Sequence, residues 1–178
     1  MIPKITKILY ATDLSPNSKY AMRYALNSAK NHDAQIIILH VLEQVQPTAQ
    51  FLISAYLDTK RVDKILEQNV DHVKARIEKR MKLFCEKELK DEPNLMDRIG
   101  SIEISEGFPA EVILKKADAL SCDIIVMGTH GKGFLGNTFL GSTTRKVLRR
   151  VRKPVYIIPL PKGTTEMTFG WDEEPDGG

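Results

Sequence analysis

The sequence has few cysteines and no long apolar run. Its longest apolar stretches, AQIIILHVL and CDIIVMG, are much shorter than the roughly 20 residues of a membrane-spanning helix, so we expect no contact with a membrane. The opening residues, MIPKITKILYATDLS, contain no signal-peptide apolar run, and we expect no secretory leader. Cys85 and Cys122 are the only cysteines, and neither has a metal-type neighbour. We therefore expect two buried, reduced thiols and a cytoplasmic protein.

The sequence also lacks a strong charge of either sign. Its formal net charge of +3 is too small to require a polyanionic partner. The densest basic run, RKVLRRVRK at 145–153, contains no aromatic residues that would stack on bases, so we interpret it as a solvated helix face. Nucleic acid is therefore not an expected partner. The apolar and charged fractions, 42% and 28%, are those of an ordinary globular protein with one core.

Short β-branched runs alternate with amphipathic stretches along the chain. We expect strands at 7–11, 34–41, 101–107, 123–127 and 154–159, and helices at 16–31, about 62–84, 108–121 and 142–151. This alternation is typical of an α/β domain, in which right-handed crossovers place helices on both faces of a parallel sheet. We assign residues 1–160 to this domain and 161–178 to an acidic, flexible tail. Ligands of such sheets bind outside the carboxyl ends of the strands.

The stretch VMGTHGKGFLGNTFLGSTTRKVL (126–148) holds five of the 11 glycines. The triplet Gly131, Gly133 and Gly136 formally fits the dinucleotide fingerprint, but it follows the fourth expected strand and lacks the downstream acid, so we reject that interpretation. The P-loop pattern is absent, because Gly131-Lys132 is followed by glycine. A wider spacing remains, Gly128-x2-Gly131-x9-Gly141, with two hydroxyl residues after it. Free amide groups at the following helix start would bind an anion such as phosphate.

This spacing, after a strand that ends in Met-Gly, resembles the nucleotide-binding subgroup of the universal stress protein family. The segments ILYATDLSPNSKYAMRYALNSAK, IIILHVLE, GFPAEVILKKADALSCDIIVMGTHG and GSTTRKVLRRVRKPVYIIP are similar to segments of that family. The resemblance runs from about Lys4 to Pro159, whereas 43–98 matches only in general helical character and the tail has no counterpart.

The resemblance implies a Rossmann-like, three-layer fold whose five-stranded parallel sheet has the order 3-2-1-4-5. It also implies binding of ATP (or AMP or ADP), with Mg²⁺ reaching the site as Mg-nucleotide. Homodimers would pair through the last strand, at Val155, Tyr156, Ile157 and Ile158. A regulatory protein partner would respond to the nucleotide state.

Candidate site residues follow from the strand ends and from the resemblance. Asp13 would bind ribose hydroxyls or the phosphate-bound metal, although an Asx-turn before the helix explains it equally simply. Val41 would lie on the adenine face or belong to the core. The complete candidate set is Ala11, Thr12, Asp13, Val41, Met127, Gly128, Thr129, His130, Gly131, Gly141, Ser142, Thr143 and Thr144. Gly107, where the third strand meets its helix, is interpreted as a turn residue.

Two other function classes stay open. An enzyme that hydrolyses ATP or transfers a group from it ranks lower, because no base–nucleophile pair stands out around His130. An interaction module without nucleotide ranks third. The nucleotide content of freshly purified protein separates the module from the other two, and phosphate release over hours separates the enzyme from the regulatory protein.

Overall fold

The five strands and three of the four expected helices match the expected bounds to within two residues at each end. The computed structural model describes residues 2–43, 92–130 and 140–159, with 75, 78, 79, 81–83, 85–87, 89 and 90 between them. Its elements are β1 (Lys7–Thr12), α1 (Pro16–His32), β2 (Gln35–Glu43), η1 (Pro93–Arg98), β3 (Ile99–Gly107), α4 (Pro109–Ala119), β4 (Ile124–Gly128), α5 (Ser142–Arg150) and β5 (Val155–Ile158). The 3-10 helix η1 has no counterpart among the expected elements. The helix expected at about 62–84 lies largely outside the described residues, and the tail 161–178 does so entirely.

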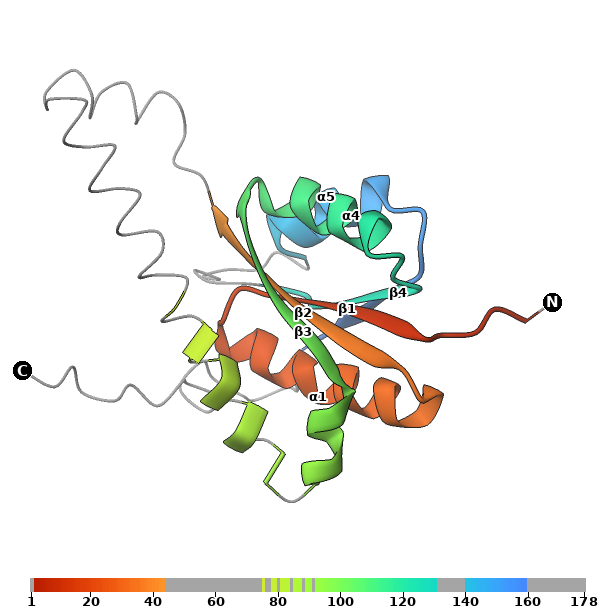
Figure 1. The fold of residues 1–178 in the computed structure, drawn as a ribbon. Coiled ribbons are helices and arrows are strands. Elements are labelled where there is room, and N and C mark those ends of the chain that lie inside the picture. Colours follow the sequence, from red (N-terminus) through yellow and green to blue (C-terminus); the bar gives the residue numbers. More distant parts are fainter. Residues whose placement is uncertain are drawn as a thin grey trace, which may run out of the picture. The chain divides into compact units, whose positions relative to one another are not determined.

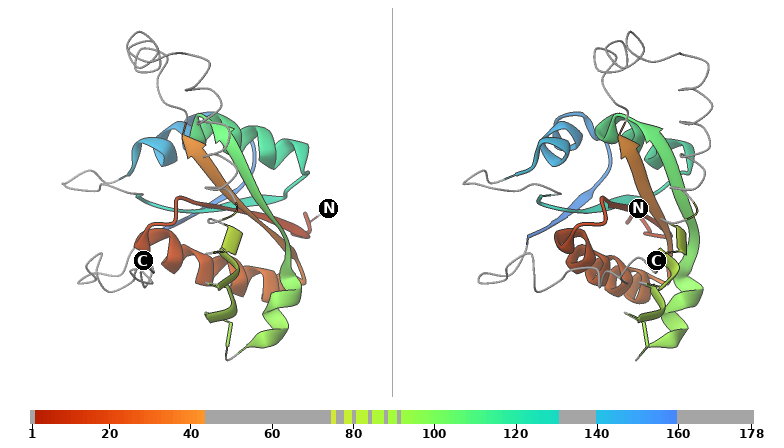
Figure 2. Two further views of the ribbon diagram at one scale, coloured as in Figure 1. Left: turned by 60° about the vertical axis from the view of Figure 1, so that its left-hand side comes forward. Right: turned by 90° about the vertical axis from the view of Figure 1, so that its left-hand side faces the viewer.

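The five strands form one parallel sheet in the order β3-β2-β1-β4-β5, which confirms the expected topology. Helix α1 covers one face of the sheet, where it contacts β1, β4 and β5 (Figure 1). Helices α4 and α5 pack against each other on the opposite face, as the turned views in Figure 2 show. The chain therefore crosses to different faces after β1 and after β4, although these two strands are neighbours.

The three central strands carry the core. From Ile8 to Thr12, from Ile36 to His40 and from Ile124 to Gly128, every residue is buried, as expected for strands covered on both faces. Burial of these continuous β-branched runs is the main stabilising contribution, at about 25 cal/mol for each Å² of apolar surface removed from water.

Helix α1 begins where the sequence predicts and buries its small-residue face. The Ser15 side chain caps the helix by accepting a hydrogen bond from the Ser18 N–H at 3.3 Å, and proline stands at the first position. Ala21, Ala25 and Ala29 are fully buried at helical spacing. Side chains this small let the helix axis lie close to the sheet.

The chain divides into two compact units, residues 1–42 with 97–178 and residues 43–96. In the second unit, the described residues between 75 and 87 are helical, and the Leu89 N–H donates to the Cys85 carbonyl at 2.9 Å. Burial, with a smaller contribution from Glu86, raises the pKa of Cys85 to about 12. Cys122, in the first unit, is also buried and free, and burial raises its pKa. The expectation of two buried thiols is confirmed.

Asp123 joins the residues before β1 to the start of β4. Its Oδ2 accepts hydrogen bonds from the Thr6 N–H at 2.7 Å, the Thr6 hydroxyl at 2.9 Å and the Lys7 N–H at 2.9 Å. Burial acts to raise the pKa of Asp123, but these hydrogen bonds and the Lys153 ammonium outweigh it and hold the pKa below its usual 3.8. The carboxylate form therefore stabilises the entry into the central strand.

We predict that Asp123→Asn lowers the free energy of unfolding by about 1–2 kcal/mol at neutral pH, because three hydrogen bonds lose their charged acceptor. A folded-state pKa below the unfolded value gives stability that is present above pH 3.8 and lost as the pH falls through the folded pKa. The deficit of the variant, measured by urea unfolding at several pH values, should thus shrink in acid. A deficit that is the same at all pH values would contradict this role of the charge.

Candidate functional site

The turn after β1 is built from buried hydroxyl groups. The Thr12 hydroxyl donates to Ser18 Oγ at 2.9 Å and accepts from the Leu14 N–H at 3.1 Å. Ser18 Oγ in turn donates to the Ser15 carbonyl at 2.8 Å, and the Tyr10 hydroxyl donates to the Ser18 carbonyl. Leu14 adopts a left-handed backbone, with φ at 62°. These bonds hold a fixed, glycine-free turn at the carboxyl end of the central strand.

Asp13 lies half-buried in this turn. Its Oδ1 accepts a hydrogen bond from the Ser15 N–H at 3.0 Å, which is the Asx-turn that the sequence offers as the simple explanation. The turn and a ligand role are compatible, because a carboxylate has two oxygens and about four lone-pair sites. The structure therefore shows the turn function of Asp13, and its ribose or metal role stays a prediction.

The end of β2 lies next to this turn. Thr12 and His40 are register partners, and His40 Nδ1 lies 2.8 Å from the Thr12 carbonyl oxygen. His40 is buried, so this imidazole aligns the two strand ends. Val41 follows it, half-buried, and packs against the core on the α4 and α5 face. Its exposed part is what would remain for contact with an adenine ring.

The end of β4 lies on the other side of β1. The ladder pairs Tyr10 with Val126, two residues before Thr12 and Gly128, so these two strand ends are neighbours. The Met127 side chain is buried in the core, which leaves only its backbone for a ligand. The Thr129 N–H donates to the Ile158 carbonyl at 3.1 Å, which carries the sheet one residue further.

Helix α5 starts beside this strand end. The Gly141 N–H donates to the Thr129 carbonyl at 2.8 Å, and the Thr144 hydroxyl donates to the Gly128 carbonyl at 3.1 Å. Both bonds bring the first turn of α5 to the carboxyl edge of β4. Thr144 is buried, so its hydroxyl secures the helix, whereas Ser142 is exposed and Thr143 half-exposed toward solvent.

Twelve of the candidate residues are thus gathered at three neighbouring strand ends and one helix start. They are Ala11, Thr12, Asp13, Val41, Met127, Gly128, Thr129, His130, Gly141, Ser142, Thr143 and Thr144. Gly131 lies outside the described residues, as do Gly133 and Gly136. The nucleotide contacts of all thirteen stay predictions.

The sequence reasoning missed Ser18. Its buried side chain links Thr12 to the Ser15 carbonyl and so holds the turn that presents Asp13. A serine three positions after a helix-capping serine was the available signal, but such a residue usually points to solvent. Ser18 therefore supports the turn that carries Asp13, but it is not itself one of the candidate ligand-binding residues.

Within the described residues, no three histidine, cysteine, aspartate or glutamate side chains gather closely enough to hold a metal ion. The helices that the structure describes include none with the length and apolar character to span a bilayer.

The model of the universal stress protein family matches residues 4–159. This chain belongs to that family. Universal stress protein MJ0577 of Methanocaldococcus jannaschii is 30% identical over 152 residues, which cover 85% of this chain and 93% of the relative. The solved structure of MJ0577 aligns with this chain at a TM-score of 0.63 and 27% identity. The alignment covers 90% of this chain and 100% of the MJ0577 chain. UspA from Lactobacillus plantarum also has a TM-score of 0.63, at 24% identity over 88% and 99% of the two chains, and supports the fold.

In this universal stress protein, we predict that Thr144→Val lowers the free energy of unfolding by about 1–2 kcal/mol, because the buried Gly128 carbonyl loses its donor. Thr143→Val is the matched control on the same helical turn and should change stability by less than about 0.5 kcal/mol. Urea unfolding without nucleotide measures both. Equal losses in the two variants would show that the hydrogen bond to Gly128 contributes nothing specific.

Proposed function

We propose that this universal stress protein binds an adenine nucleotide, ATP with Mg²⁺, at the carboxyl edge of β1 and β4, and acts as a regulatory protein through its nucleotide state and its dimer. The observation that carries the proposal is the uncapped start of α5 beside the end of β4, the strand that pairs with β1 and lies next to its fixed turn. In parallel sheets, ligands bind where the chain crosses to opposite faces after neighbouring strands, as it does after β1 and β4.

The start of α5 differs from the starts of α1 and α4. Helix α1 has the Ser15 cap, and α4 has Glu111 in its first turn. Helix α5 has Gly141 at the cap position, no side-chain cap and no acidic residue in its first turn. Its first amide groups have no acceptor within the helix, and its dipole favours a negative charge there. A phosphate group supplies both acceptor and charge, and the Ser142 and Thr143 hydroxyls lie next to it.

The other end of the ligand would lie over β1 and β2. Asp13 is the acid at this edge whose carboxylate can accept from ribose hydroxyls or share a phosphate-bound Mg²⁺, since hard cations prefer carboxylate oxygens. The backbone of Ala11 and Thr12 would border the adenosine, and Val41 would present its half-buried side chain to the adenine ring. In this arrangement the base would lie toward β2 and the phosphates toward α5.

We rank nucleotide binding above nucleotide turnover. His130 Nδ1 lies 3.0 Å from Thr129 Oγ1, but Thr129 is held by its backbone hydrogen bonds to the neighbouring strand and helix. In the sequence, no base–nucleophile pair stands out around His130, as nucleophilic catalysis requires, so an enzyme that consumes ATP remains the second candidate. Nucleotide occupancy would instead be read by a regulatory protein partner.

We predict that Mg-ATP binds the purified protein and that Gly131→Val abolishes binding. The added side chain would block the close approach of the loop backbone to the phosphates. Isothermal titration calorimetry measures the affinity of both proteins, and circular dichroism checks that the variant is folded. Unchanged affinity in the variant would contradict the phosphate role of the glycine spacing.

A second variant separates ligand contact from turn formation at Asp13. Asp13→Asn keeps an oxygen that accepts from the Ser15 N–H, but removes the charge. We expect weaker Mg-ATP binding by about tenfold or more, since a hydrogen bond to a charged group contributes about 1.5–3 kcal/mol. Circular dichroism without nucleotide checks that the variant is folded. Equal affinity at saturating Mg²⁺ would leave Asp13 with its turn role alone.

The proposed dimer uses the exposed edge of β5. The carbonyls of Pro154 and Ile158 accept from β4, so the alternate residues of this parallel strand, Val155 and Ile157, point their N–H groups away from β4. Tyr156 is 38% exposed, and in the described sheet no further strand covers this edge. Pairing of two β5 strands about a two-fold axis would satisfy both edges and close the assembly.

We predict that the wild-type chain is a dimer and that Ile157→Pro is a monomer. Proline removes an outward donor while the bonds from β5 to β4 remain. Ile157→Val, which keeps the donor, is the control and should stay dimeric. Light scattering at micromolar concentration distinguishes the two states. A monomeric wild-type protein would show that the β5 edge is protected in another way.

A further inference from the structure

A pocket opens at the amino edge of the sheet, at the opposite end of α5 from the proposed nucleotide site. It has a volume of about 270 Å³ and lies between the ends of α4 and α5 and the start of β4. Leu114, Ala117, Ile125 and Val151 form its apolar part. All four belong to, or pack against, the core between the sheet and the two helices. The pocket is therefore an opening onto the apolar core.

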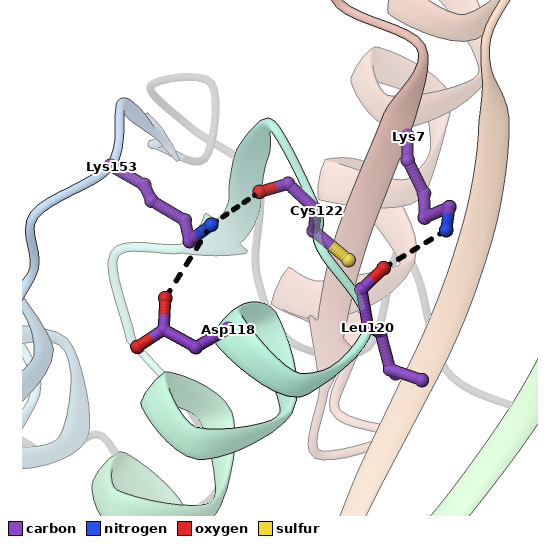
Figure 3. A network of polar contacts seen from close by, with 5 residues as sticks. All are labelled: Lys7, Asp118, Leu120, Cys122 and Lys153. Atoms are coloured by element: carbon purple, nitrogen blue, oxygen red, sulfur yellow. Dashed lines mark hydrogen bonds and ion pairs between the residues drawn. The ribbon is translucent and has the colours of Figure 1, made fainter.

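Basic side chains surround this opening. Arg150, Arg152 and Lys153 line it, with Asp118 as the single acid among its lining residues. Figure 3 shows Lys153 between the Cys122 carbonyl, 2.9 Å away, and the Asp118 carboxylate, 3.4 Å away. Lys153 is thus held in place, while Arg150 makes only an exposed ion pair with Glu111 at 3.4 Å. Arg152 is exposed and has no carboxylate partner among the described residues.

The excess of positive charge continues along α5. Arg145, Lys146 and Arg149 are exposed, and none has an ion pair with a carboxylate in the described part of the chain. Exposed Leu148, at 40%, lies among them. An apolar pocket beside unneutralised cations fits a ligand that combines an aromatic group with carboxylates. An arginine over an indole ring adds a cation–π attraction.

The chain itself contains such a segment. Trp171 is its only tryptophan and is followed directly by Asp172, Glu173 and Glu174. These residues lie outside the described part of the chain. The chain leaves β5 at the carboxyl edge of the sheet, and the four residues of this strand span about 13 Å between that edge and the amino edge. The 12 residues from Leu160 to Trp171 can extend over about 40 Å, which is longer than this distance. The segment can thus reach the pocket of its own chain.

We propose that the segment 171–174 docks on its own chain at this pocket, with the Trp171 indole on the apolar part and the three carboxylates beside Arg150 and Arg152. This surface is separate from the proposed nucleotide site, because α5 lies between them. Docking neutralises part of the basic helix and covers an opening onto the core.

Fluorescence of Trp171 tests the proposal in the full-length chain, since no other tryptophan contributes to the signal. Acrylamide is the appropriate quencher because it is neutral, so changes in local charge do not alter its concentration near the indole. We expect Trp171 to be shielded from acrylamide at low salt. The shielding should be lost toward about 1 M salt, where the Debye length falls to about 3 Å.

The decisive variant is Arg150→Gln with Arg152→Gln. Each exposed ion pair shifts an equilibrium by a factor of about two to five, so this double variant should raise the quenching constant of Trp171 about twofold or more. Arg23→Gln with Lys30→Gln removes the same charge from exposed positions on α1 and should leave the quenching constant unchanged. A triple variant of the acids, Asp172→Asn, Glu173→Gln and Glu174→Gln, should act like the Arg150 and Arg152 variant.

Three results would overturn the proposal. The first is a quenching constant of the folded wild type that equals the constant of the same protein unfolded in urea, which would mean that Trp171 is not shielded. The second is an equal response of the α1 control and the Arg150 and Arg152 variant, which would indicate a general charge effect. The third is shielding that grows with protein concentration, because it would place the segment on a second copy of the chain.

Discussion

The central position of β1 is the constraint on which the rest of this structure depends. Hydrogen bonds to β2 on one side and β4 on the other bury the strand from Ile8 to Thr12, and Asp123 fixes its entry through Thr6 and Lys7. Because the chain leaves β1 toward one face and reaches α5 on the other, the segments that follow the neighbouring ends of β1 and β4 diverge. The candidate site lies where they diverge, and the turn that presents Asp13 is rigid because its hydroxyl groups are buried and bonded to one another.

Helix α5 has different chemistry at its two ends. Its start is uncapped and tied to β4 through Thr144, so its amide groups and dipole favour an anion. Its last turn carries Arg149 and Arg150, which interact favourably with the negative end of the dipole. The basic residues that stabilise this helix end also place exposed positive charge beside the apolar pocket. A ligand at one end and an acidic segment at the other would therefore share one helix without sharing a surface.

Membership of the universal stress protein family and the α/β fold with its strand order were predicted from the sequence, and both are confirmed. The reason is local: continuous β-branched runs, the Ser15-Pro16 helix start and the spacing of alanines in α1 each specify their element without help from distant residues. The clustering of Thr12, Gly128 and Gly141 also followed from the sequence, because strand ends of a parallel sheet meet at one edge.

Other features depend on which distant residues the fold brings together. Thr144 on the Gly128 carbonyl and Asp123 on the Thr6 N–H are hydrogen bonds between residues 16 and 117 positions apart, which no local pattern identifies. The pocket between α4 and α5 likewise exists only once two helices and a strand meet. The sequence by itself determined the elements, their order and the family, since periodicity, capping and glycine spacing act over a few residues. Only the tertiary structure decided which hydroxyls and carboxylates are bonded within the fold, because some of their partners, such as Thr6 for Asp123, lie 117 positions away along the chain.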